Sequence, residues 1–149
     1  MANGDIGTQM STLRSEMIEL MAQDRKREYL NLCIHNYSEA IEIIRELYPE
    51  YYRSGDHFDT LYKEAMEKKE LKATEEEIRI HEAAIARNSV MPYCYERLAI
   101  LYCKQKNYRR AYEVCMKWFD AGFWKIPNSA TSSLNLLGRL EKLERKIGP

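Results

Sequence analysis

The sequence has few residues that interrupt secondary structure and no long apolar run. Only six of its 149 residues are glycine and four are proline, which argues against a disordered or low-complexity chain. No apolar run approaches the roughly 20 residues that a membrane-spanning helix needs. The polar opening, MANGDIGTQMSTLRSE, lacks the apolar segment of a secretory signal. We therefore expect a cytoplasmic protein with no membrane contact.

Neither sign of charge is in excess. Twenty-three basic residues balance twenty-three acidic residues, so the formal net charge at pH 7 is zero. The chain as a whole gives no electrostatic reason to expect nucleic acid or a membrane surface as a partner. Whole-chain charge thus argues against nucleic acid binding.

The residue patterns of metal sites and of common enzymes are missing. The four cysteines and three histidines form no CxxC pair and no compact Cys/His group. His81-Glu82 begins like the HExxH zinc motif, but Ile85 occupies the position of the second ligand. Neither a glycine-rich phosphate loop nor a GxSxG elbow is present. We expect no metal, no cofactor and no catalytic residues.

Strand signals are also missing, whereas apolar residues recur at helical spacing almost everywhere. We predict an all-α fold of antiparallel helical hairpins, about seven helices in a single domain over residues 1–149. The predicted parts are a flexible tail at 1–8, N-terminal helices at 9–70, a core at 74–125 and a capping helix at 128–149.

Four local patterns bear on where helices begin, continue and end. The charged run Asp24–Glu28, DRKRE, contains no helix breaker, so we interpret it as the solvated face of one long N-terminal helix rather than as an interruption. A second apolar stripe, from Cys33 to Leu47, is predicted to end before Pro49. Thr74 and Glu77 match a capping box, in which each side chain would bond the other residue's backbone N–H. Gly148 and Pro149 are expected to end the last helix.

The strongest motif lies between residues 95 and 118. It consists of seven residues at fixed spacing: Tyr95, Leu98, Ala99 and Tyr102, then Ala111, Cys115 and Trp118. This pattern resembles the tetratricopeptide repeat (TPR), W-x2-L-G-x2-Y followed by A-x3-F. The small residues Ala99 and Ala111 would let two antiparallel helices approach closely, while the large side chains fill the space around them.

The resemblance covers one repeat well, at residues 92–125, and its neighbours only poorly. It implies that 74–125 is a TPR-like core in a right-handed superhelix, covered at its end by 128–149, because one repeat cannot bury its own faces. The alternative is a helical bundle that shows one such motif by chance.

The same resemblance implies a function. First helices of these repeats line a groove that binds peptides or protein segments, so the chain would be a non-enzymatic adaptor or scaffold with a protein or peptide partner. The corresponding positions here are Tyr93, Glu96, Arg97, Ile100, Cys103 and Lys104. Only Arg97 suits the carboxylate clamp of chaperone-binding members, so no such clamp is expected. The alternative is that these residues pack against the preceding helix pair.

Three aromatic residues in loops are further candidates for a binding surface: Trp124, Tyr51 and Tyr52. Packing in the core is the favoured alternative for Trp124. Lys104, Lys106, Arg109 and Arg110 surround a turn with Tyr108 among them, and Arg25–Arg27 form a second basic cluster. A nucleic-acid-associated or regulatory helical protein that uses the Lys104–Arg110 patch is therefore the alternative function.

The last predicted helix, 130–147, has a narrow apolar seam. Leu136, Leu140, Leu143 and Ile147 follow one another at spacings of four, three and four. Such a stripe must be buried against something. We expect it to cover the repeat, and any part left open would pair with a second copy of the chain.

Overall fold

The computed structural model describes residues 6–52 and 58–148, and its secondary structure in these ranges is helical, with no strand. The prediction of an all-α fold is confirmed. The α-helices are α1 (Ile6–Ala22), α2 (Lys26–His35), α3 (Tyr37–Leu47), α4 (Phe58–Glu70), α5 (Thr74–Ala86), α6 (Pro92–Lys104), α7 (Tyr108–Asp120) and α8 (Ala130–Ile147). Short 3-10 helices lie at Pro49–Tyr52, Phe123–Lys125 and Pro127–Ser129.

The chain divides into two compact units. The N-terminal unit comprises Met1–Tyr52 and Trp124–Leu134, and the C-terminal unit comprises Arg53–Phe123 and Asn135–Pro149. A single domain stays a prediction, because packing into two units does not decide whether they fold independently. Residues 1–5 of the predicted tail lie outside the described residues, and Ile6–Thr8 form the start of α1.

The N-terminal unit is built from α1, α2 and α3 together with the returning segment 124–134. The Tyr29 hydroxyl, on a fully buried side chain, donates a 2.6 Å hydrogen bond to the backbone oxygen of Lys125. Its ring meets the Trp124 ring edge-on, with centroids 5.3 Å apart. Trp124 is 3% exposed, so the structure places it in the interior of this unit rather than on a binding surface. The segment 124–134 thus completes the core of α1–α3.

The prediction of one long helix through residues 24–28 is wrong, because α1 ends at Ala22. Asp24 has a left-handed backbone, with φ at +57°. The Asp24 N–H donates to the Met21 oxygen and the Arg25 N–H to the Leu20 oxygen, the bond pair of a Schellman motif. The second predicted helix is interrupted as well, at Asn36, where φ is −131°. The expected boundary between the two N-terminal helices lies instead within α2, so three α-helices are described here where two were expected.

Three more helices end in the same way. The left-handed residues are Lys72 after α4, Asn88 after α5 and Lys106 after α6, each with the same pair of backbone hydrogen bonds. Glycine is the usual residue at this position because it has no Cβ to clash. None of the four sites has glycine, so the sequence carried no strong sign of these ends.

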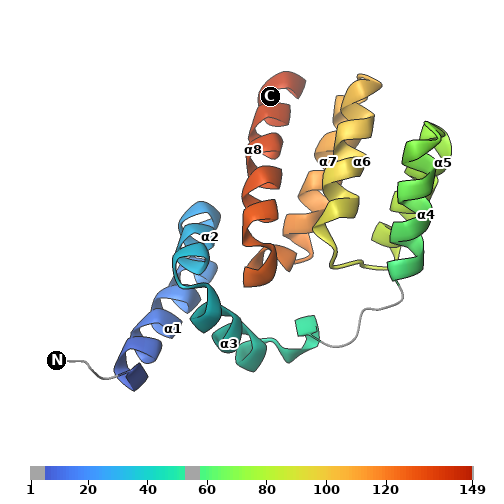
Figure 1. Ribbon diagram of the computed structural model, residues 1–149. Coiled ribbons are helices and arrows are strands. Elements are labelled where there is room, and N and C mark those ends of the chain that lie inside the picture. Colours follow the sequence, from blue (N-terminus) through green and yellow to red (C-terminus); the bar gives the residue numbers. More distant parts are fainter. Residues whose placement is uncertain (1–5, 53–57, 149) are drawn as a thin grey trace. The chain divides into compact units, whose positions relative to one another are not determined.

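The C-terminal unit stacks its helices in chain order. Figure 1 shows α4 and α5, then α6 and α7, with α8 beyond them as a further neighbour of α7. The Lys146 ammonium of α8 lies 4.7 Å from the ring centroid of Tyr108 in α7. Consecutive helices run antiparallel, as expected from the short connections. The finer prediction of a TPR-like superhelix stays a prediction.

The seven residues of the repeat motif all lie in the interior. Ala99 and Ala111 are fully buried in neighbouring helices. Trp118 is also fully buried, and its ring contacts Tyr95 edge-on at 5.0 Å between centroids. The other members, Leu98, Tyr102 and Cys115, are at most 5% exposed.

The predicted capping box does not form. The N-cap of α5 is Ala73, and Thr74 is already the first helical residue, with no side-chain cap. Glu77 is 1% exposed and points into the C-terminal unit instead. A carboxylate so deeply buried needs strong partners, because burial without them is costly.

The seam of α8 is covered within a single chain. Leu136, Leu140 and Leu143 are 0%, 7% and 3% exposed, and Ile147 is half-buried. These three leucines are not open to a second copy in this structure. Gly148, with φ at +84°, ends α8 as predicted, and Pro149 lies outside the described residues.

Candidate binding face

The six predicted groove residues share the side of α6 that faces away from its buried core. Lys104 is exposed, and the other five are half-buried: Tyr93, Glu96, Arg97, Ile100 and Cys103. The opposite side of the same helix carries the buried residues, among them Tyr95, Leu98 and Tyr102. We call the outward residues Tyr93 to Lys104 the α6 strip.

Tyr93, the first residue of the α6 strip, contacts helix α4. The Tyr93 hydroxyl donates to the Met66 sulfur at 3.3 Å, and the Tyr62 ring meets the Tyr93 ring edge-on at 5.3 Å between centroids. Burial raises the pKa of the Tyr93 phenol above its ordinary value. Tyr62 is 37% exposed, so this aromatic pair has one half-buried ring and one ring at the surface. Tyr62 was not among the site residues predicted from the sequence.

Two residues of the strip, Glu96 and Cys103, lie near Cys115 of α7. Burial raises the pKa of the Cys115 thiol to about 12, and the Arg139 guanidinium partly opposes this shift while Cys103 and Glu96 add to it. Charges act on a buried group only from nearby, so Arg139, Cys103 and Glu96 each lie near the Cys115 thiol of α7.

Arg97 is not a free cation of this strip. Its Nε and Nη2 atoms donate to the two carboxylate oxygens of Glu77 in α5, at 2.7 and 3.1 Å. The alternative interpretation, packing against the preceding helix pair, therefore describes Arg97 and Tyr93. Ile100, Cys103 and Lys104 remain as the part of the strip with no such contact to α4 or α5 among the described residues.

Glu77 also accepts a hydrogen bond from His81, one turn further along α5, at 3.1 Å from Nε2. Burial alone would raise the Glu77 pKa, but the hydrogen bonds from Arg97 and His81 outweigh burial and lower it. Burial lowers the pKa of His81 and outweighs the attraction of Glu77. The cluster is therefore an ionised Glu77–Arg97 pair with a neutral imidazole beside it.

A second carboxylate of α5 joins three helices. Glu82 accepts a hydrogen bond from the Tyr102 hydroxyl of α6 and another from Arg110 Nη2 of α7, the latter at 2.8 Å. Burial and this bond to Glu82 raise the pKa of Tyr102 to about 12. Glu77 and Glu82 together fix the position of α5 against α6 and α7.

The loop aromatics are half-buried in the N-terminal unit. The Tyr52 hydroxyl donates to Asn128 Oδ1 at 2.7 Å, and the Arg45 guanidinium lies 4.8 Å from the Tyr52 ring centroid. The Tyr51 ring contacts Tyr48 at 5.5 Å between centroids. Both candidates thus take part in packing interactions of their own unit.

The two basic clusters differ in how far they are neutralised. Arg25 pairs with Glu28, and Lys26 pairs with Asp24. In the patch around the α6–α7 turn, Arg110 pairs with Glu82, but Lys104, Lys106 and Arg109 are exposed and have no ion-pair partner among the described residues. The α6–α7 turn is the more strongly positive of the two.

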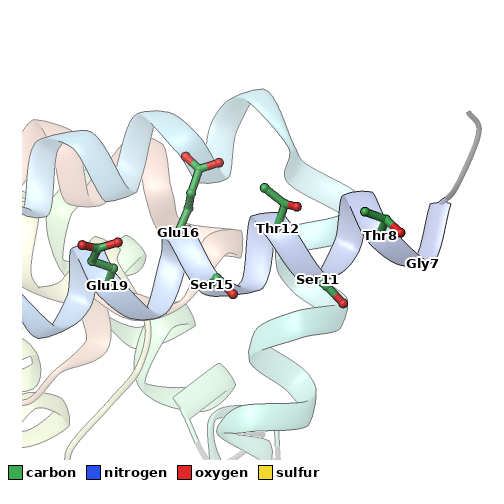
Figure 2. Close-up of a pocket in the computed structure, with 7 residues that line it drawn as sticks. All are labelled: Gly7, Thr8, Ser11, Thr12, Ser15, Glu16 and Glu19. Atoms are coloured by element: carbon green, nitrogen blue, oxygen red, sulfur yellow. The ribbon is translucent and has the colours of Figure 1, made fainter. Parts of the chain in front are cut away.

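Shallow hollows lie elsewhere on the surface. One of them, about 540 Å³, runs along α1 and is lined by Gly7, Thr8, Ser11, Thr12, Ser15, Glu16 and Glu19 (Figure 2). All seven residues come from one helix, so this hollow is the space beside a row of small side chains. Another, about 160 Å³, lies between α5 and α7 and includes Glu82 and Arg110.

Glu77, His81 and Glu82 were not predicted from the sequence to be structural partners. The available signal was position: Glu77 and His81 are four residues apart and fall on the same face as the buried Ala84 and Ile85. Within residues 6–52 and 58–148, no three His, Cys, Asp or Glu side chains come together as a metal site. In the same ranges no helix is both long and apolar enough to cross a membrane.

Comparison with known proteins gives no match among protein-family models, curated proteins or solved structures.

Proposed function

We propose that the chain is a non-enzymatic, TPR-like interaction module of the cytoplasm that binds a peptide or protein segment along the α6 strip. The observation that carries this proposal is the aromatic pair Tyr62–Tyr93, which joins α4 to the strip and leaves Tyr62 at the surface. Aromatic residues at a surface supply much of the energy of protein interfaces.

The rest of the strip suits an extended or helical segment. Ile100 and Cys103 provide apolar contact, and exposed Lys104 stands at the end of the same line. The bonds of Glu77 and Glu82 hold α5, α6 and α7 together. A preformed surface loses little conformational entropy on binding, which favours affinity.

The test is a selection of displayed random peptides on the full chain, followed by calorimetry with the selected peptides. Ile100→Asp should weaken binding by at least about tenfold, because it places a charge at the centre of an apolar contact. Tyr62→Ala should weaken binding as well.

The matched control is Ile18→Asp, which changes an isoleucine that is 44% exposed on α1. Circular dichroism should show both isoleucine variants to be folded. Peptides that bind wild type and Ile100→Asp equally well would place binding elsewhere and contradict the proposal.

A further inference from the structure

The α6–α7 turn and the end of α8 meet at one end of the C-terminal unit. Lys146, in the last turn of α8, lies over the ring of Tyr108, the first residue of α7. Figure 1 shows the C-terminus of α8 and the α6–α7 turn at the same end of this unit. The sequence alone did not indicate that these basic segments are neighbours.

The charges of α8 are separated around the helix. Arg139, Lys142 and Lys146 follow at spacings of three and four, so they share one side, and Arg145 adjoins them. Glu141 and Glu144 fall on the other flank. Because Lys146 contacts Tyr108, the basic side is the one that adjoins α7. We call this side of α8, together with Lys104, Lys106 and Arg109, the basic end.

Arg109 of the basic end and its neighbour Arg110 are placed where they do not help their own helix. The N-terminus of a helix carries partial positive charge, so basic residues in its first turn are unfavourable. Helix α7 has no acidic residue in its first turn, and it has Arg109 and Arg110 there. Glu82 neutralises Arg110, but Arg109 has no ion-pair partner among the described residues. Arg109 therefore lowers the local stability of α7 and forms no ion pair that compensates for it. A residue that destabilises its own helix in this way indicates a binding role.

We propose that the basic end binds the phosphate backbone of nucleic acid. Phosphate binding can be driven by charge alone, whereas an acidic peptide needs apolar anchors to bind tightly. The exposed large apolar side chains of the described residues, Ile18, Ile34, Tyr37, Tyr62 and Leu71, all lie outside α6, α7 and α8. The face of Tyr108 is covered by Lys146, so recognition rests on the backbone charges.

The test measures fluorescence anisotropy of a labelled oligouridylate with the full chain over a series of salt concentrations. The patch variant combines Lys106→Gln, Arg109→Gln and Lys146→Gln. The control variant, with the same loss of charge, combines Lys63→Gln, Arg79→Gln and Arg87→Gln, three exposed residues of α4, α5 and its C-terminal cap. A polyglutamate peptide of equal charge serves as the competing ligand.

The expected result is salt-dependent binding by wild type and by the control. Each lost phosphate contact lowers the slope of log affinity against log salt by about 0.7 for a single strand, so the patch variant should lose about 2 in slope. Equal binding by wild type and patch variant would overturn the inference. Binding of polyglutamate with none of the oligouridylate would also overturn it, in favour of an acidic protein segment. Neither outcome bears on the α6 strip, which the peptide selection tests separately.

Discussion

Arg97 and Glu77 form a two-bond ion pair that joins α6 to α5 across 20 positions of sequence, with N–O distances of 2.7 and 3.1 Å. The Glu77 side chain is 2% exposed and the Arg97 side chain 15%. Because both side chains are largely removed from water, each charge needs the other to offset the free-energy cost of its burial. The pair therefore fixes which helices meet, whatever its net contribution to stability.

Removing one member of this pair should be more harmful than removing both. Glu77→Ala should lower the free energy of unfolding by about 3 kcal/mol, because it leaves the Arg97 charge without its partner. The double variant Glu77→Leu, Arg97→Met should recover much of that loss. Urea denaturation measures both.

Glu46→Ala is the matched control for the single variant. Glu46 pairs with Arg14 at 2.9 Å, but the two side chains are 68% and 38% exposed. A surface pair of this kind contributes about 0–1 kcal/mol. Similar losses in Glu46→Ala and Glu77→Ala would contradict the described burial of Glu77.

Stability should fall on acidification in two stages. The folded-state pKa of His81 is lowered, so the unfolded chain binds its proton more readily and stability is lost as pH falls below the ordinary His value of about 6.5. The folded-state pKa of Glu77 is also lowered, so its contribution is present above the ordinary Glu value of about 4.3 and is lost below it.

His81→Gln separates the two stages, because glutamine can still donate to Glu77 but does not titrate. The variant should lose the dependence on pH between about 6.5 and 5 and retain the steeper loss at lower pH. An unchanged profile in His81→Gln would show that His81 does not titrate differently on folding.

The contact between α6 and α7 should not tolerate a larger side chain. Ala111 is fully buried, so Ala111→Leu should destabilise the protein by about 1–3 kcal/mol through overpacking. Ala83→Leu, on the exposed side of α5, should change stability by less than about 0.5 kcal/mol. The comparison of thermal unfolding midpoints checks this, and equal midpoints would remove Ala111 from a close helix contact.

The protein should be stabilised by glycine at a helix end where another residue has a left-handed backbone. Lys72 has φ at +57° after α4, and Lys72→Gly should raise the free energy of unfolding by about 1 kcal/mol because it removes the Cβ clash. Lys69→Gly, within the last turn of α4, should instead lower it by about 0.5–1 kcal/mol. Two shifts of the same sign would contradict the described geometry.

Local sequence patterns predicted the helices and the buried motif. They did not predict which residues pair when the partners are far apart in the sequence. Periodicity placed Tyr95 and Trp118 on buried faces because a helix repeats its face every three or four residues. The end of α1 was missed because Asp24 adopts a conformation that glycine usually takes. The Glu77–Arg97 pair was missed because nothing in either segment specifies a partner 20 residues away.

The candidate face was predicted only in outline. The spacing of the repeat motif indicated the outward side of α6, and its residues do lie on that side. The sequence could not show that Arg97 forms an ion pair with Glu77, nor that Tyr62 of α4 contacts Tyr93. Both depend on how neighbouring helices pack, which periodicity within one helix does not determine.

The two tryptophans of the chain give each unit its own optical reporter. Trp118 is fully buried in the C-terminal unit, and Trp124, only six positions later, is 3% exposed in the N-terminal unit. In Trp118→Phe the emission would report on α1–α3 alone, and in Trp124→Phe on the repeat motif alone. Denaturation of the two variants, followed by fluorescence, would thus show whether the halves of this small protein melt together or in sequence.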